Sequence, residues 1–399
     1  MNKSLQQLAG IAANMDKKVI GLMSGTSLDG LDIALCRIRG SGAETRAELL
    51  EFMTVNYPDH LTEELNQISF RREISLEDLC VLHTSLGRYY ADLVMEALGQ
   101  WGMDPGEVDL IASHGQTVYH APAFMHKREG KPNATLQIGD GDQIARKTGI
   151  LTVSDFRQKH TAAGGEGAPI TSVVDRLLFR HRSEDRIILN IGGIANFTYL
   201  PSSAADDRRS VTTDTGPGNT LINAAVQRAF GQPFDRDGSI ASTGQIDPEL
   251  YRELKKHPFF KRSLPKSTGP EMFNLEWVDD QVRNAGITQP DPGDLVATLT
   301  WLSAETIADA IRSLDVEQLP AIYLCGGGMY NKQLTGWLQE LLEEYTIQSF
   351  EEIGFLPDAR EAVSFAILAN ETLSGGACTI HPIKGTERLV NFGKISLPV

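Results

Sequence analysis

The sequence predicts an α/β protein of two similar domains, each with a mixed sheet flanked by helices, arranged around a central cleft. At 399 residues the chain is longer than one ordinary hydrophobic core, so two domains of similar size are expected. Short apolar runs alternate with segments of helical periodicity, which is typical of α/β folds. A hairpin with a polar, glycine-containing turn occurs near residue 25 and again about 170 residues later.

The first half of the chain opens with a predicted hairpin. Apolar runs at residues 19–23 and 31–38 flank the turn SGTSLDG, and its Asp-Gly pair is typical of tight connections between strands. Residues 1–18 lack the continuous apolar stretch of a secretion signal and are expected to form a short amphipathic turn or a frayed extension. The other elements expected in this half are strands at 49–55, 110–113, 135–138 and 150–153 and helices at 61–70 and 76–101.

The second half begins with the same pattern. Predicted strands at residues 187–191 and 194–200 flank a Gly-Gly turn. We therefore expect a first domain of residues 1–184 plus 359–399 and a second domain of residues 185–358. The elements that follow are expected to be strands at 211–213 and 321–324 and helices at 219–230, 248–256, 275–285, 294–314, 332–344 and 359–373.

The composition argues against several classes of protein. A formal net charge of -15 opposes nonspecific attraction to nucleic acid or anionic lipid. No apolar stretch approaches the roughly 18–20 residues of a membrane-spanning helix. A P-loop, a G-x-G-x-x-G turn and an H-E-x-x-H metal motif are also missing. Four widely spaced cysteines without a C-x-x-C pair indicate buried, reduced thiols and a cytoplasmic protein: Cys36, Cys80, Cys325 and Cys378.

The turn SGTSLDG is the strongest candidate for a phosphate-binding loop. Gly25 and Gly30 allow close approach of the backbone, and the Thr26-Ser27 pair offers hydroxyl and amide donors. The carboxylates of Asp29 and Asp32 can hold hydrated Mg²⁺ beside phosphate oxygens, because proteins usually bind Mg²⁺ through one or two carboxylates and several waters. An ordinary hairpin turn remains the alternative, since Asp-Gly is common there.

Two further glycine-rich turns follow predicted strands in the second half. NIGGIAN contains Gly192, Gly193 and Asn196 and is the same kind of turn as SGTSLDG, so the two hairpins could grip one polyphosphate from opposite domains. CGGG, at residues 325–328, could let a flat ring lie against a backbone without side chains. Each turn is equally compatible with an ordinary tight connection. The glycines of the second turn are Gly326, Gly327 and Gly328.

DTGPGN joins a predicted strand to a predicted helix. Its Asp214 could be a simple carboxylate near the helix N-terminus, where the helix dipole favours negative charge. Its position at a strand end beside two glycines suits a general base on the floor of the cleft equally well. Both interpretations stay open from the residues alone.

Ten ordered motifs resemble those of the anhydro-N-acetylmuramic acid kinases, a family of the acetate and sugar kinase, chaperone ATPase and actin superfamily. The match runs in order from about residue 19 to about residue 373. The resemblance implies an actin-like ATPase fold. The motifs are GLMSGTSLDGLDIAL, SHGQTVYH, LQIGDGDQIA, DFR, AAGGEGAP, LNIGGIANFT, DTGPGN, PKSTG, CGGG and DAREAVSFA.

The resemblance also implies an activity. ATP, water and 1,6-anhydro-N-acetylmuramic acid would give N-acetylmuramic acid 6-phosphate and ADP, a step of cell-wall recycling and amino-sugar catabolism. Asp214 matches the family's catalytic aspartate, and Glu361 matches a glutamate on the Mg·ATP side of the cleft, so Mg²⁺ is expected at Asp29, Asp32 and Glu361. The phosphate loop corresponds to Gly25, Thr26, Ser27, Leu28, Asp29, Gly30, Leu31 and Asp32. The sugar is expected beside His114, Gly115, Gln116, Thr117, Asp155, Arg157, Gly216 and Asn219.

This reaction explains why one essential carboxylate suffices. Glycoside cleavage usually needs a base for water and an acid for the leaving oxygen. Here the leaving oxygen, O6, stays on the sugar and can attack the γ-phosphate, so the phosphoryl group takes the place of the acid's proton. Only the base remains to be supplied, and Asp214 would activate water at the anomeric carbon.

Three positions depart from the family pattern. His160 stands where DFR is usually followed, after two residues, by an aspartate, and Pro270 follows PKSTG in place of an arginine. The ending IKGTERLVNFGKI matches the family only loosely. A protonated His160 near the lactyl carboxylate of muramic acid would attract that charge. The alternative is a tolerant loop in which His160 has no role.

Two other functions compete with this interpretation. A kinase of the same fold could act on another amino sugar or anhydrosugar, and a chaperone or sugar sensor could use ATP as a switch. The intact Asp214 favours catalysis, because a sensor has no need for a base at the sugar. A requirement for added anhydrosugar in ADP release would separate the two classes. We expect a small-molecule sugar as partner, neither nucleic acid nor membrane, and leave a homodimer open.

Overall fold

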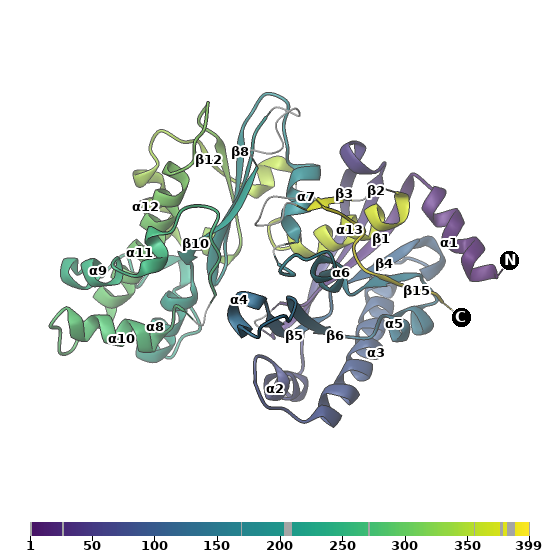
Figure 1. Cartoon of the computed structure of the whole chain (residues 1–399), viewed down its shortest axis with the longest axis horizontal. Coiled ribbons are helices and arrows are strands. Elements are labelled where there is room, and N and C mark those ends of the chain that lie inside the picture. The colour runs from purple at the N-terminus through teal and green to yellow at the C-terminus, as the bar shows by residue number, and fades with distance from the viewer. Residues whose placement is uncertain are drawn as a thin grey trace. The chain divides into compact units, whose positions relative to one another are not determined.

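The computed structural model describes residues 2–25, 28–168, 170–202, 210–269, 272–354, 356–375, 378–380 and 388–398. The chain divides into two compact units (Figure 1). Unit 1 holds Met1–Leu178 and Ala359–Val399, and unit 2 holds Phe179–Asp358. Among the described helices, none combines the length and the apolar character needed to cross a membrane.

A six-stranded mixed sheet forms the centre of unit 1. Three antiparallel strands follow one another in sequence, and β4 and β7 then add in parallel on the side of β1. The last strand, β15, closes the edge antiparallel to β7. The strand order is β15 (Lys394–Ser396), β7 (Thr152–Ser154), β4 (Leu110–Ser113), β1 (Asp16–Met23), β2 (Gly30–Arg39) and β3 (Arg46–Asn56).

Helices cover both faces of this sheet. On one face, Ile20 and Leu22 of β1 share a buried cluster with Leu86 and Tyr90 of the long helix α3 (Leu76–Gln100). On the other face, α13 (Arg360–Ser374) lies so close to β1 that a Cβ on Gly21 would come within 1.9 Å of the Ala362 carbonyl oxygen. The other elements of unit 1 are α1 (Lys3–Ala13), α2 (Asp59–Ile68), α4 (Ala123–His126), α5 (Gly141–Thr148), α6 (Phe156–Ala162), α7 (Thr171–Leu178), the hairpin β5 (Gln116–Ala121) with β6 (Ala134–Ile138), and the pair β13 (Cys378–Ile380) with β14 (Arg388–Val390).

The five-stranded sheet of unit 2 has the topology of the first five strands of unit 1. Its first three strands are antiparallel neighbours, and β11 and β12 add in parallel beside β8. The strand order is β10 (Val211–Pro217), β9 (Ile194–Leu200), β8 (Arg186–Ile191), β11 (Ala321–Cys325) and β12 (Ile347–Ser349). In each unit the first five strands of the sheet have the order 3-2-1-4-5, which is the arrangement of the actin-like ATPase fold, so the predicted α/β class with two similar mixed sheets is confirmed.

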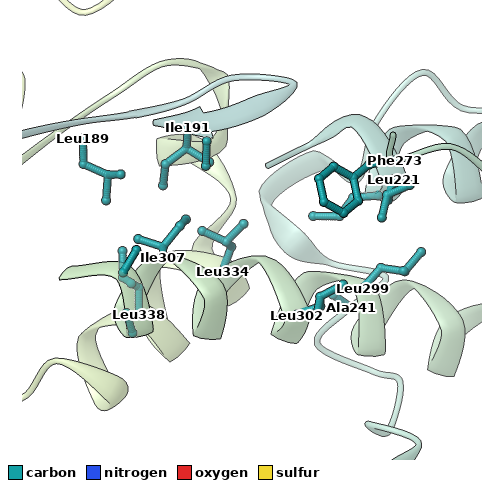
Figure 2. Close-up of a cluster of buried hydrophobic side chains, with 14 of the residues drawn as sticks. Leu189, Ile191, Leu221, Ala241, Phe273, Leu299, Leu302, Ile307, Leu334 and Leu338 are labelled. Atoms are coloured by element: carbon teal, nitrogen blue, oxygen red, sulfur yellow. The ribbon is translucent and has the colours of Figure 1, made fainter. Parts of the chain in front are cut away.

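The core of unit 2 lies between one face of its sheet and a layer of helices (Figure 2). Leu189 and Ile191 of β8 point into this core and meet Ile307 and Leu334. Since successive strand residues alternate between faces, Asn190 lies on the opposite face, together with the polar residues paired to it. The helices of unit 2 are α8 (Thr220–Phe230), α9 (Pro248–Leu254), α10 (Leu275–Asn284), α11 (Pro292–Arg312) and α12 (Lys332–Leu341).

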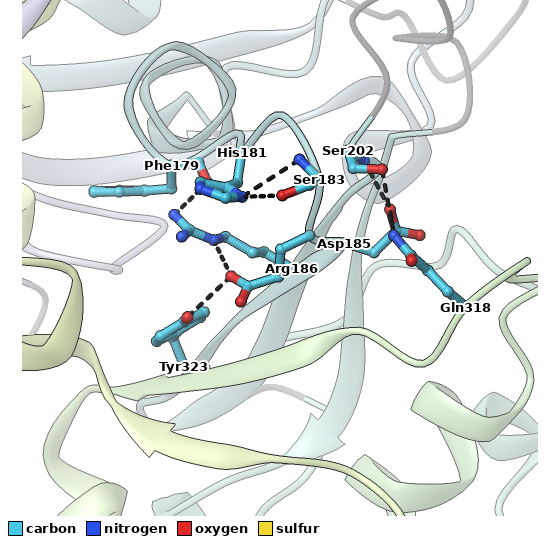
Figure 3. A network of polar contacts seen from close by, with 9 residues as sticks. Phe179, His181, Ser183, Asp185, Arg186, Ser202, Gln318 and Tyr323 are labelled. Carbon is cyan, nitrogen blue, oxygen red and sulfur yellow. Dashed lines mark hydrogen bonds and ion pairs between the residues drawn. The ribbon is translucent and has the colours of Figure 1, made fainter.

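Unit 2 begins at Phe179, whereas the sequence predicted that it begins at Asp185. The segment before β8 is held by unit 2 itself (Figure 3). Arg186 donates to the Phe179 carbonyl at 3.0 Å and to the Glu184 carboxylate at 2.6 Å, and the Tyr323 hydroxyl donates to the same carboxylate at 3.0 Å. These contacts fasten residues 179–184 to the second sheet.

Two local expectations are wrong. The N-terminal segment forms the regular helix α1 (Lys3–Ala13), begun by an Asn2 side chain that accepts the Ser4 N–H at 2.9 Å. Cys80 lies exposed on α3, whereas Cys36 and Cys325 are buried as predicted. Cys80 lies on the solvent-facing side of α3, where the apolar side chains of Leu76 and Val81 are exposed as well.

Candidate active site

The turn between β8 and β9 and the start of α8 form one hydrogen-bonded substructure in unit 2. The Gly192 carbonyl accepts the Asn219 N–H at 2.8 Å, and the Gly193 carbonyl accepts the Gly218 N–H at 2.8 Å. A Cβ on Gly218 would lie 2.3 Å from the Gly192 oxygen, so this crossing requires glycine. NIGGIAN and DTGPGN are therefore brought together, and the two carbonyls of the turn are occupied by these hydrogen bonds.

CGGG packs directly onto the same strand. Gly326 has a φ of +79°, and a Cβ there would lie 2.4 Å from the Asn190 Oδ1. A Cβ on Gly328 would lie 2.2 Å from the Cγ2 of Ile191. At Gly327 nothing lies within 4 Å of an added Cβ. The first and third glycines thus fit the turn against β8, and the middle one faces open space.

A row of polar residues crosses the unit 2 sheet at the level of these turns. Asp214 pairs with Asn196, Asn196 pairs with Asn190, and Asn190 pairs with Cys325. Directly paired residues share a face of a sheet, and Leu189 and Ile191 point into the helical core. The row therefore lies on the face away from that core, as a polar floor that ends at Asp214.

Asp214 is held by the backbone of the PKSTG segment. Its Oδ2 accepts the Thr268 N–H at 2.8 Å, and its own N–H donates to the Lys266 carbonyl at 2.9 Å. The pairing of β10 with β9 shifts between Asp214 and Gly216, so a bulge turns the strand at the carboxylate. Burial raises the pKa of Asp214 to about 6, and the Thr268 hydrogen bond opposes this rise.

Position 216, two residues after Asp214, requires glycine. Its φ is +149°, and a Cβ would lie 2.9 Å from the Phe260 ring. The Asn219 side chain donates to the Ile191 carbonyl at 3.2 Å and helps to hold the helix start on β8. Both predicted sugar-side residues of unit 2 thus have structural contacts that shape the surroundings of Asp214.

In unit 1 the predicted phosphate loop connects β1 to β2. Leu28 adopts a φ of +58° with its side chain buried in the core, and Leu31 is also buried there, so only their backbone groups could contact a nucleotide. A Cβ on Gly30 would lie 2.6 Å from the Val55 carbonyl oxygen. The predicted ligands Thr26 and Ser27 lie outside the described residues.

A buried polar network holds the start of this loop. The Tyr57 hydroxyl lies 2.8 Å from that of Tyr90 and donates to the Ser24 hydroxyl at 2.7 Å. Ser24 in turn donates to the Gln116 side chain, which donates from Nε2 to the Gly25 carbonyl at 3.0 Å. Gln116, predicted to contact the sugar, therefore fixes the peptide at the entrance of the loop.

The three predicted Mg²⁺ ligands all belong to unit 1. Asp32 pairs with Met23 on the face that carries α13, and its Oδ1 accepts the Thr54 hydroxyl at 2.6 Å. Glu361 is exposed in the first turn of α13, and Asp29 is exposed at the end of the loop. Among the described residues no three His, Cys, Asp or Glu side chains are gathered closely enough to hold a metal. One or two partly exposed carboxylates still fit Mg²⁺ that is also bound by phosphate and water.

His114 and Arg157 form the most constrained pair among the predicted sugar-side residues of unit 1. The Arg157 Nε donates to the His114 Nε2 at 2.7 Å, so His114 must carry its proton on Nδ1, which lies 2.7 Å from the Gly115 carbonyl oxygen. Burial, followed by the charge of Arg157, holds the pKa of His114 well below its usual value. A neutral imidazole thus orients the guanidinium, whose pKa is lowered by burial and raised by Glu361.

The other predicted sugar-side residues of unit 1 do not join this pair. Asp155 begins α6 with a φ of +57°, and its Oδ2 pairs with Lys394 of β15 at 2.8 Å. The Thr117 hydroxyl accepts from Gln137 at 3.3 Å in the neighbouring strand. Gly115 has a φ of +77°, and a Cβ there would lie 2.5 Å from the Ile138 carbonyl oxygen. These three residues support β5, β15 and the surrounding turns.

The hypothesis for His160 is wrong. Only 7% of His160 is exposed, and its Nδ1 accepts the Gly167 N–H at 3.1 Å. Burial, then the charge of Arg157 and then that of His120, lower the pKa of His160 to about 4, so the ring is neutral near pH 7. A neutral, internally bonded ring cannot attract a lactyl carboxylate by its charge.

Two functional segments were missed by sequence reasoning. PKSTG supplies the N–H that fixes Asp214, and Gly167 of AAGGEGAP supplies the carbonyl that binds Arg157 and the N–H that binds His160. Both were visible as motifs. Their partners Asp214, Arg157 and His160 lie 54, 10 and 7 residues away in the sequence, so no local pattern could assign the contacts.

Comparison with known proteins gives a consistent result. The family model described as "Anhydro-N-acetylmuramic acid kinase" matches residues 17–398. A protein of that name from Pseudoalteromonas atlantica is 44% identical over 402 residues, covering 100% of both chains. Another, from Caldanaerobacter subterraneus, is 39% identical over 400 residues, covering 98% of this chain and 100% of the relative.

Solved structures are more distant. The activator of the 2-hydroxyisocaproyl-CoA dehydratase from Clostridium difficile, with bound ADPNP, is 10% identical with a TM-score of 0.42, covering 89% of this chain and 95% of that one. A ROK family glucokinase from Streptomyces griseus, in complex with glucose and AMPPNP, is 12% identical with a TM-score of 0.35, covering 88% and 98%. The family match over nearly the whole sequence is the decisive result: the chain belongs to the anhydro-N-acetylmuramic acid kinase family.

Proposed function

We propose that the chain uses ATP to open 1,6-anhydro-N-acetylmuramic acid with water and to phosphorylate O6, giving N-acetylmuramic acid 6-phosphate and ADP. The observation that carries the proposal is Asp214, a carboxylate at a strand bulge whose pKa burial raises to about 6. A base with a pKa near the working pH combines a large ionised fraction with useful proton affinity. The family match supports the choice of substrate.

The bond changes balance with a single protein base. Asp214 takes a proton from water as the water oxygen bonds to C1, and the C1–O6 bond breaks. The freed O6 bonds to the γ-phosphorus, and the bond from that phosphorus to the β-phosphate oxygen breaks to release ADP. The Thr268 N–H holds one carboxylate oxygen in place during proton transfer. No acid is required, because O6 receives a phosphoryl group instead of a proton.

The glycine turns supply the nucleotide site in this proposal. The backbone N–H groups of Gly192 and Gly193 and of the loop at Gly25 would bind phosphate oxygens. The carbonyls of Gly192 and Gly193 already accept hydrogen bonds from the start of α8, so the backbone N–H groups of the turn would be the ones that bind an anion. The open position at Gly327 would let the adenine or ribose approach the backbone.

Asp29, Asp32 and Glu361 are the residues that would hold Mg²⁺. The Thr54 hydroxyl orients the Asp32 carboxylate, and Asp29 and Glu361 are exposed to a hydrated ion. When bound, Mg²⁺ supplies positive charge that offsets the negative charge on the phosphoryl oxygens. The sugar would be bound in unit 1 by Arg157, which His114 orients.

We also infer a cytoplasmic location. Cys36, Cys80 and Cys325 are free thiols, and proteins of oxidising compartments usually pair their cysteines. Fractionation of producing cells, with a periplasmic and a membrane marker as controls, tests this directly.

The test of the proposed function is ADP release by the purified protein, measured with and without 1,6-anhydro-N-acetylmuramic acid. The proposal expects release to depend on that sugar. Release that depends on a different amino sugar would keep a kinase but change its substrate. ATP hydrolysis that is indifferent to every sugar in a panel would contradict the proposal and favour an ATP-switched protein.

A further inference from the structure

A short glycine loop follows α6 and is held at a single residue. Gly167 donates its N–H to the His160 Nδ1 at 3.1 Å, and its carbonyl accepts the Arg157 Nη1 at 2.9 Å. Arg157 and His160 are three residues apart on α6, so both side chains lie on one face of that helix. Two side chains of α6 thus bind the backbone N–H and the backbone carbonyl of Gly167.

The His160 ring fits into the loop without spare room. A Cβ on Gly165 would lie 2.2 Å from the His160 Nε2, and the Gly165 N–H donates to the His160 carbonyl at 3.0 Å. On another side the ring lies 6.4 Å from the Phe392 ring, measured between centroids. The loop can close over His160 only because Gly165 lacks a side chain.

Arg157 is thereby fixed by two acceptors. Its Nε donates to His114 and its Nη1 donates to the Gly167 carbonyl. Its Nη2 makes no hydrogen bond to any described residue, and the side chain remains partly exposed. A guanidinium held at two nitrogens presents its third in a defined direction to a bound molecule.

We propose that His160 is a positioning residue that acts through Gly167 to orient Arg157 toward the oxygen atoms of the sugar. The proposal rests on the proposed function, because it takes the sugar as the ligand of Arg157. His160 itself does not touch the sugar. It fixes the N–H of Gly167, the residue whose carbonyl sets the orientation of the guanidinium.

The same contact explains how a histidine can occupy a position where aspartate is expected. The Oδ1 of Asp or Asn and the Nδ1 of His are each bonded to Cγ, so all three can accept the Gly167 N–H from nearly the same place. Burial keeps His160 neutral and therefore able to accept. What the position requires is an acceptor, and the charge is secondary.

Two substitutions of similar bulk or geometry separate these roles. His160→Phe keeps the ring volume but removes the acceptor, and His160→Asn keeps the acceptor but removes the ring. Lys159→Ala, on the exposed side of α6, is the control for a change in the helix. Each variant is compared with wild type for KM of the anhydrosugar, kcat, Kd of ATP and hydrogen exchange at the Gly167 amide.

We expect His160→Phe to raise the KM of the sugar by at least about 5-fold, the effect of one lost buried hydrogen bond, with Kd of ATP unchanged. Gly167 exchange should accelerate in His160→Phe and stay slow in His160→Asn and Lys159→Ala. The KM of His160→Asn should lie closer to wild type than that of His160→Phe. Equal KM values and equal Gly167 exchange in wild type and His160→Phe would overturn the proposal.

The exchange measurement keeps the two proposals apart. If wild type fails to turn over the anhydrosugar, the proposed substrate is wrong, yet the Gly167 result still reports whether His160 holds the loop. If wild type turns over the sugar and His160→Phe loses Gly167 protection without any change in KM, His160 holds the loop but does not position Arg157. A KM equally raised in the Phe and Asn variants would show that ring packing, and not the acceptor, is what matters.

Discussion

The backbone N–H of Thr268 donates to the Oδ2 of Asp214 at 2.8 Å, although the two residues are 54 positions apart in the sequence. This bond fixes the carboxylate without neutralising it. No described residue donates a hydrogen bond to the Oδ1, which leaves one oxygen of this carboxyl group, whose pKa burial raises to about 6, for a water molecule. The geometry thus provides an oriented carboxylate with one oxygen available, as the proposed base requires.

Replacing Asp214 by asparagine should remove the base and little else. The amide oxygen of Asp214→Asn can still accept from Thr268, but the side chain cannot take a proton from water. We expect kcat to fall by roughly 10²–10⁴-fold, the usual contribution of a positioned base, while the Kd of ATP stays near that of wild type. Single-turnover kinetics and ATP titration check this. A variant that keeps most of its turnover would exclude Asp214 as the base.

The fall of kcat/KM at low pH, the acid limb of the pH profile, should be absent from Asp214→Asn. Because only the ionised carboxylate accepts a proton, kcat/KM of wild type should fall tenfold per pH unit below about pH 6. Glu305 is the matched control, since burial raises the pKa of that carboxyl to about 7 on α11, and Glu305→Gln should leave the limb in place. A flat profile between about pH 5 and pH 8 would be inconsistent with the raised pKa.

The ionised carboxylate of Asp214 should lower the free energy of unfolding. Its folded pKa of about 6 lies above the ordinary 3.8, so the folded state binds the proton more tightly. The free energy of unfolding therefore falls as pH rises from about 4 to about 6 and stays lowered above that range. Asp214→Asn should be more stable than wild type at neutral pH by up to about 3 kcal/mol, with the gain vanishing near pH 4. Urea denaturation at both pH values checks this, and a less stable variant at neutral pH would refute it.

The open glycine of CGGG should be needed for the nucleotide and not for the fold. Because nothing lies within 4 Å of a Cβ at Gly327, Gly327→Ala should leave Tm unchanged. The added methyl should raise the Kd of ATP about 10-fold, since an overlap with a ligand costs roughly 1–3 kcal/mol. Gly336→Ala, on α12 with equally open surroundings, is the control and should not alter ATP binding. Equal ATP affinities in the two variants would place the nucleotide elsewhere.

Much of the fold follows from local patterns. The strand around Ile20 and the strand around Ile33 alternate or run apolar, and the Asp29-Gly30 pair between them turns the chain. The same holds for the hairpin around Gly192. Short-range periodicity and turn chemistry suffice for such elements, which is why the repeated topology could be predicted. The strand β5 and the helices α5, α6 and α7 were not predicted, because they are short and their stability comes from tertiary packing.

The site could be predicted only in part, because residue type does not reveal a partner. Asp214 was predicted to be the base from its place at a strand end together with its match to the family motif DTGPGN, but its Thr268 contact depends on a segment that folds back from beyond α9. Asp155 was expected beside the sugar, yet it pairs with Lys394 from the C-terminal strand. His160 departed from the expected aspartate and keeps the acceptor that the position requires. Long-range contacts decided each of these cases.

The central claim is that one chain couples hydrolysis of the anhydro bond to phosphorylation of O6. The most direct measurement is mass spectrometry of the product formed from ATP and 1,6-anhydro-N-acetylmuramic acid in ¹⁸O-water, with Asp214→Asn as the control. The account predicts a sugar phosphate with ¹⁸O at C1, unlabelled phosphate at O6 and one ADP per product. Phosphate that carries ¹⁸O, or ADP formed while the anhydrosugar stays intact, would contradict it.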